Sequence, residues 1–131
     1  MARWLPLQEL DTYTSYDILR AALRPIHWLG SSLEDLRGFP EVARRDIGAE
    51  LTLVQGGESP TDWKPMKSVG ASVIEVRVHR PGEYRVLYVA KFGEAIYILH
   101  AFEKRTQKTP KGEIDVAKRR LAELMRIRRG A

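Results

Sequence analysis

The densest group of reactive side chains in this sequence lies just after residue 100. The stretch HAFEKRTQKTPK spans His100 to Lys111, and within eight positions it carries four cations, Lys104, Arg105, Lys108 and Lys111. It follows an apolar run and leads into Pro110, where a helix is expected to begin. Arginine binds phosphate through two parallel hydrogen bonds and lysine binds it as a point charge. Such a segment, placed where a strand leaves a sheet, suits contacts with a phosphate backbone.

Two arginines on neighbouring predicted strands extend this pattern. Arg77 lies on the polar side of SVIEVRVH (72–79), and Arg85 lies on the hairpin partner of that strand. Because side chains alternate across a strand, both arginines can converge on one open sheet surface. The alternative is that each forms a surface ion pair with an acid such as Glu75 or Glu83.

Aromatic residues lie close to these cations in the sequence: Tyr84, Tyr88, Tyr97 and Phe102. A basic sheet face with aromatics is a plausible platform for single-stranded RNA, because bases stack on rings while phosphates pair with cations. The alternative is that these aromatics belong to the core.

The residue types exclude several other chemistries. The chain has no cysteine, so it forms no disulfide, thiolate metal site or cysteine nucleophile. His27, His79 and His100 lack the spacing of zinc ligands, and P-loop, dinucleotide-binding and nucleophile-elbow motifs are absent. We therefore expect neither a metal nor a cofactor.

Charge is unevenly distributed along the 131 residues. Residues 1–63 carry 6 Lys/Arg and 10 Asp/Glu, whereas residues 100–131 carry 10 and 4, within a net charge of +5. This asymmetry favours a polyanionic partner, and the alternative is a solvated basic surface. No apolar run approaches the roughly 20 residues of a membrane span, and the N-terminus does not resemble a secretory signal. We expect a cytoplasmic protein with no membrane partner.

The elements that would position these cations follow from periodicity. We expect a short strand at 25–30 and a helix at 31–38, in which Ser31 and Glu34 have capping-box spacing. A second helix is expected at 40–55, with a loop at 58–72. Strands at 72–79, 84–91 and 95–102 have short connections and predict an antiparallel meander. A last helix begins at Pro110.

This order predicts an α+β fold: a small antiparallel sheet covered on one face by an N-terminal helical hairpin, with a C-terminal helix. The polar side chains of the meander would gather on the other, open face. Residues 1–24 are expected to be an N-terminal extension with a possible short helix, and residues 25–131 to form one domain.

Four segments carry a resemblance to a known family: WLGSSLEDLRGFPEVAR, DWKPMKSVGASVIEVRVH, YRVLYVAKF and IYILHAFEKRTQKTPKGEIDVAKRR. Over about residues 25–123 they resemble the RelE/ParE toxin superfamily, and most closely its phage-derived, HigB-like branch. The resemblance implies the toxin of a type II toxin–antitoxin system, with a small antiparallel sheet, two N-terminal helices and a C-terminal helix. It also implies a cognate antitoxin, expected to be of helix-turn-helix type.

The resemblance further implies metal-independent cleavage of mRNA, usually on the ribosome, through attack by a ribose 2′-OH. Carried over by motif, the catalytic residues are Arg77, Arg85 and Lys104. Arg105, Lys108, Lys111 and Tyr84 would contact RNA. The chain lacks the tyrosine and the acid-aromatic-histidine group that related toxins place near their C-terminus, so the general acid and base stay unassigned.

Three alternatives remain open from the sequence. The ParE arm of the superfamily poisons DNA gyrase, and a non-catalytic member would only bind its antitoxin or RNA. Within the cleavage hypothesis, His100 rivals Lys104 because an imidazole titrates near neutral pH. His100 lies in an apolar strand, however, which favours a structural role.

Overall fold

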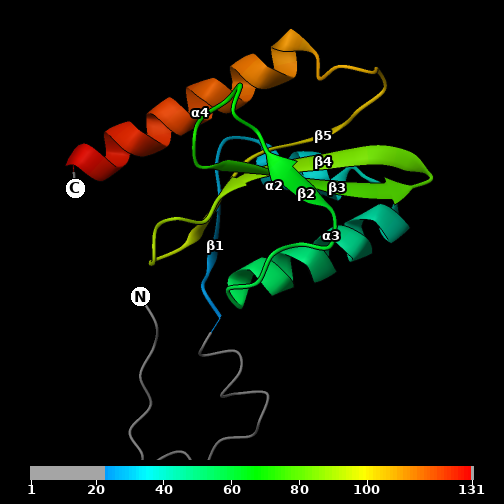
Figure 1. Cartoon of the computed structure of the whole chain (residues 1–131), viewed down its shortest axis with the longest axis horizontal. Helices are drawn as coiled ribbons and strands as arrows, with labels where there is room; N and C mark the ends of the chain where they lie inside the picture. Colours follow the sequence, from blue (N-terminus) through cyan, green and yellow to red (C-terminus); the bar gives the residue numbers. More distant parts are fainter. Residues whose placement is uncertain (1–22, 131) are drawn as a thin grey trace, which may run out of the picture.

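The computed structural model of the chain describes residues 23–130 (Figure 1). The short helix expected within residues 1–24 falls almost wholly outside this range. The described elements are, in order, β1 (Ile26–Trp28), α2 (Ser32–Arg37), α3 (Glu41–Gln55), β2 (Trp63–Pro65), β3 (Val73–Arg80), β4 (Gly82–Val89), β5 (Ile96–Glu103) and α4 (Lys111–Gly130). No helix in this range has the length and apolar content needed to cross a bilayer.

The strands form a single five-stranded sheet in the order β1-β5-β4-β3-β2. Strands β3, β4 and β5 are antiparallel neighbours, which confirms the predicted meander. Strand β1 instead pairs in parallel with β5, which places the first strand at the far edge. The register of β4 against β5 shifts between Leu87 and Tyr88, so a bulge interrupts the ladder beside the β5 residues that face α4.

Helices cover the sheet on both sides, with α3 below it and α4 above it in Figure 1. Strands β3 and β4 carry apolar residues on both faces, and because side chains alternate across a strand, each strand contributes to two separate cores. Val76, Val86 and Ile98 pack with Ile47 and Leu51 of α3. On the opposite face, buried side chains from the strands pack with Ala117 and Leu124 of α4: Val73, Leu87, Val89 and Leu99. The predicted α+β class is confirmed.

Three details differ from the sequence-based expectations. The loop expected at 58–72 contains β2, three residues without apolar periodicity that pair with β3. The Ser31 side chain makes no capping hydrogen bond; its hydroxyl donates to Asp35 and accepts from Arg120 of α4. The face expected to stay open is partly covered, because α4 packs over its centre and leaves the hairpin end of β3 and β4 uncovered.

Arg24 ties the beginning of the described chain to the connection between β4 and β5. Its guanidinium donates to the carbonyl oxygens of Ala90 and Phe92 at 2.7 and 3.0 Å. Its own backbone exchanges hydrogen bonds with Gln55 at the end of α3. Arg24 therefore belongs physically to the domain whose start was expected at residue 25.

These contacts predict where the chain can be shortened. A chain that begins at Leu23 should unfold cooperatively in urea, because both cores lie within residues 23–130. A chain that begins at Ile26 lacks Arg24 and should be less stable than the Leu23 chain by about 1–3 kcal/mol, since part-buried carbonyls lose their donors. Equal stability of the two chains would show that Arg24 contributes nothing to the domain.

Candidate functional site

The β3–β4 hairpin sets two predicted site residues directly opposite each other. Arg77 and Arg85 are register partners, so their side chains leave the sheet on the same face. Like charges at such positions destabilise a sheet unless another group offsets the repulsion. The structure thus brings these two cations together as expected, and their proximity needs a counter-charge.

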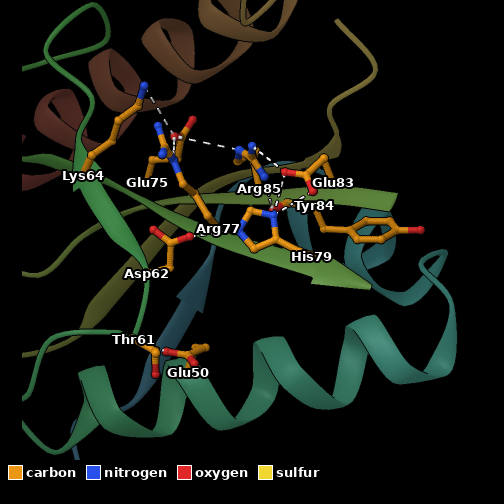
Figure 2. A network of polar contacts seen from close by, with 10 residues as sticks. All are labelled: Glu50, Thr61, Asp62, Lys64, Glu75, Arg77, His79, Glu83, Tyr84 and Arg85. Atoms are coloured by element: carbon orange, nitrogen blue, oxygen red, sulfur yellow. Dashed lines mark hydrogen bonds and ion pairs between the residues drawn. The ribbon is translucent and has the colours of Figure 1, made fainter. Parts of the chain in front are cut away.

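That counter-charge is the carboxylate of Glu75 (Figure 2). Glu75 is fully buried, and its Oε1 lies 3.1 Å from Nε of Arg77 and 3.9 Å from Nε of Arg85. The ammonium of Lys64, on β2, lies 4.0 Å from the same oxygen. A buried carboxylate is tolerated only when cations and hydrogen bonds compensate its lost hydration. Glu75 therefore pairs with the arginines as the sequence alternative suggested, but its carboxylate is buried rather than exposed on the protein surface.

Arg85 is the most enclosed cation of this group, with 5 % of its surface exposed. Its Nη1 donates to the carbonyl oxygen of Tyr84 at 3.1 Å and its Nη2 to Glu83 Oε1 at 3.0 Å. Among the described residues, Nε of Arg85 and Oε2 of Glu75 are buried without a hydrogen-bond partner. Polar atoms left unsatisfied in this way are uncommon and often mark functional sites.

An open hollow of about 450 Å³ lies over Arg85. It is lined by Glu83, Arg85, Lys104, Arg105, Thr106 and Gln107. The backbone N–H of Lys104 donates to the carbonyl oxygen of Glu83 at 2.6 Å, so the segment after β5 stays attached to the start of β4. The structure thus brings Lys104 and Arg105 to the hollow, as their positions in the sequence suggested.

The remaining predicted contacts are more peripheral. Arg105 is 81 % exposed in its side chain and pairs with Glu103, which raises the pKa of the guanidinium through a hydrogen bond. Lys108 and Lys111 are exposed on the loop and on the first turn of α4, outside the lining of the hollow. Lys108 and Lys111 can add long-range attraction for an anion but do not line its site, whereas Arg105 lines the hollow from an exposed position.

Tyr84 lies on the opposite face of the sheet from Arg77 and Arg85. It is 4 % exposed and packs against Phe39, with ring centroids 4.8 Å apart. The other aromatics considered from the sequence are also buried in the two cores: Tyr88, Tyr97 and Phe102. These aromatics therefore belong to the core, which was the alternative left open from the sequence. They provide no exposed surface beside the arginines on which RNA bases could stack.

His100 is buried on the face of the sheet that α4 covers. Nη1 of Arg120 lies 3.3 Å from its Nδ1, and because arginine can only donate, Nδ1 is the acceptor. The opposite ring nitrogen, Nε2, then carries a proton and donates to Glu113 at 3.1 Å. The ring is 6 % exposed and stacks on Phe102. This packing agrees with a structural role for His100.

His79 is the candidate that the sequence reasoning missed. Its Nδ1 lies 2.7 Å from Glu83 and its Nε2 lies 2.8 Å from Asp62 (Figure 2). Hydrogen bonds to Asp62 and then to Glu83 raise the pKa of this imidazole above its usual 6.5. The alternation of side chains along β3 places His79 on the same polar face as Arg77. This pattern was the feature of the sequence that could have identified His79 as a site residue.

A larger hollow of about 560 Å³ lies between α2, the end of β5 and the start of α4. Four carboxylates line it, Glu34, Asp35, Glu103 and Glu113. This concentration of negative charge disfavours a phosphate there. Within residues 23–130, no group of three or more His, Asp or Glu side chains is arranged to hold a metal ion.

Comparison with known proteins gives one family. A family model described as phage derived protein Gp49-like (DUF891) matches residues 34–122, which include the cationic hairpin and the segment after β5. This family is associated with toxins of toxin–antitoxin systems. No curated protein matches the chain.

The buried carboxylate of Glu75 leads to a prediction about the stability of the fold. Glu75→Gln should lower the free energy of unfolding by about 3–5 kcal/mol, because three cations then lose a buried counter-charge. Glu41→Gln removes an exposed ion pair with Arg45 and should change stability by no more than about 0.5 kcal/mol. Urea unfolding of both variants at pH 7 measures the difference. If the two losses were equal, the buried cluster would not hold the hairpin together.

Proposed function

The chain belongs to the Gp49-like family of phage-derived proteins, and from this membership and the cationic hollow we propose that it is a toxin that cleaves RNA. The observation that supports the proposal best is Arg85, a buried and aimed guanidinium at a hollow whose other lining cations are Lys104 and Arg105. A phosphodiester is the anion that such a site fits. We further propose that the substrate is mRNA bound to the ribosome.

Cleavage without a metal uses chemistry that RNA supplies itself. The ribose 2′-oxygen attacks the adjacent phosphorus, the bond to the 5′-oxygen breaks, and a 2′,3′-cyclic phosphate and a 5′-hydroxyl result. The 2′-OH loses a proton and the leaving 5′-oxygen gains one, so no oxidant or co-reactant is needed. Charge accumulates on the phosphorane oxygens, and cations aimed at them lower the barrier.

The geometry supports separate roles for the three proposed catalytic residues. Arg85 would hold a phosphate oxygen at the floor of the hollow, because Glu75 behind it and the Tyr84 carbonyl beside it fix its guanidinium. Lys104 would reach the same phosphate from the rim. Arg77, 29 % exposed in its side chain, would stabilise the neighbouring phosphate or the phosphorane. Preorganised charge of this kind requires no rearrangement at the moment of reaction.

An antitoxin is the second proposed partner. The net charge of +5 and the cations around the hollow favour an acidic segment that covers Arg85 and excludes RNA. Neutralisation would then be competitive, because the antitoxin and the phosphate backbone would use the same cations.

Variants of the hollow test the cleavage proposal. Arg85→Lys keeps the positive charge beside Glu75 but loses bidentate geometry, and it should cleave mRNA about 10²–10³ times more slowly than wild type. Lys104→Ala should be slower by at least tenfold, whereas Lys118→Ala, an exposed cation of α4, should cleave at the wild-type rate. Single-turnover cleavage on programmed ribosomes measures the rates, with circular dichroism and urea unfolding as folding controls.

The same proteins separate the proposal from its alternatives. Wild-type rates for a folded Arg85→Lys protein would remove Arg85 from the site. If wild type left RNA intact and inhibited DNA supercoiling by gyrase, the chain would act as a gyrase-directed toxin. If it did neither and bound only its antitoxin, it would be non-catalytic.

A further inference from the structure

Glu83 occupies the approach to Arg85. Its Oε1 accepts a hydrogen bond from Nη2 of Arg85 at 3.0 Å and lies 2.7 Å from Nδ1 of His79. Its side chain is 41 % exposed, whereas that of Arg85 is 6 % exposed. A phosphate that binds Arg85 through Nη2 therefore competes with a carboxylate of the chain.

The second partner of Glu83 determines how tightly it holds Arg85. Both ring nitrogens of His79 face carboxylates, Glu83 on one side and Asp62 on the other, so both contacts are complete only when both nitrogens carry protons. Figure 2 shows the ring between Asp62 and Glu83, with Arg85 beside Glu83. As an imidazolium, His79 supplies a positive charge that competes with Arg85 for Glu83.

The charges around His79 come from four elements. Asp62 faces it from the segment before β2, Glu83 and Arg85 from β4, and Arg77 from β3 itself. Asp46 and Glu50 of α3 line the hollow of about 220 Å³ that His79 shares with Arg77. Asp46 pairs with Arg80, and the Glu50 carboxylate accepts from the backbone of Thr61. Asp62 and Glu83 are thus the acids in direct contact with the ring.

We propose that Glu83 is an internal competitor of the RNA phosphate at Arg85 and that the proton on His79 controls this competition. The inference rests on the proposed RNA-binding function of the hollow. When His79 is protonated, Glu83 is neutralised by the imidazolium and yields Arg85 to phosphate. When His79 is neutral, Arg85 is the remaining direct cationic partner of Glu83 and stays bound to it. His79 and Glu83 are therefore positioning residues that act through Arg85.

The direction of the pH dependence follows from the contacts. Hydrogen bonds to Asp62 and Glu83 raise the pKa of His79, so the imidazolium is complete below pH 6.5 and is lost as pH rises through the raised pKa. The loss of charge is the same whichever ring nitrogen releases the proton. Affinity of the hollow for an anion should consequently fall as the pH rises through this raised pKa.

Calorimetric titration of the full chain between pH 5.5 and 8.5 tests this competition. One probe is sulfate, which stays dianionic over this range, and the other is a short RNA with 2′-O-methyl groups that block cleavage. Wild type should bind both probes about two- to fivefold more weakly at high pH, the range expected for one partly exposed ion pair. Glu83→Gln should bind as tightly at high pH as wild type does at low pH.

Three further variants sharpen the result. Glu58→Gln makes the same change in net charge just after the end of α3, outside the lining of the hollow, and should keep the wild-type pH dependence. His79→Gln should bind weakly at every pH, whereas His79→Lys should keep its affinity at high pH because its charge persists. A merely structural role for His79 would not produce this difference between glutamine and lysine.

The outcomes separate the inference from the proposed function. A Glu83→Gln protein that keeps the wild-type pH dependence, or that matches Glu58→Gln in affinity, would overturn the competition even if RNA is bound and cleaved. Sulfate binding with the predicted pattern, but no binding of RNA, would support the competition and remove the proposed function. If neither probe binds, both the competition at Arg85 and the proposed RNA-binding function are wrong.

Discussion

The buried carboxylate of Glu75 is the interaction on which the candidate site depends. Arg77 and Arg85 face each other across β3 and β4, and without a negative charge between them their repulsion would oppose the hairpin register. The carboxylate in turn could not be buried without these cations. Each partner therefore requires the others, and the cluster fixes the direction of Arg85 more firmly than surface side chains are fixed.

Two carboxylates contact Arg85, and they differ in exposure. Glu75 lies behind it, fully buried, and serves as a permanent counter-charge. Glu83 lies in front of it, partly exposed, and shares its carboxylate with a titratable imidazole. In the proposed mechanism, a phosphate would replace the outer acid, so Arg85 would be shielded in the free protein and still available to RNA. This arrangement reconciles the low exposure of Arg85 with its proposed binding role.

Periodicity predicted most of the fold because most elements bury an apolar face. The apolar stripes of α3 and α4 and the apolar runs of β3 to β5 met that condition, whereas β2 consists of three exposed residues and had no such signal. For the site, the alternation of side chains along the strands placed Arg77 and Arg85 on one face. It did not predict how deeply each side chain is buried, so Glu75 was expected to be a surface acid. Contacts that join distant segments, such as Asp62 with His79, are set by tertiary packing and leave no local pattern.

Nitrogen-15 NMR of the arginine side chains during titration with a non-cleavable 2′-O-methyl RNA tests the central claim most directly. The Nε–Hε signal of Arg85 is the specific reporter, because Arg85 lines the hollow and its Nε is buried without a hydrogen-bond partner. The account predicts that the signals of Arg85 and Arg77 shift first and saturate together, while the signal of Arg128, which lies over the Phe92 ring, stays in place. RNA that shifts the α4 arginines and leaves Arg85 unchanged would contradict it.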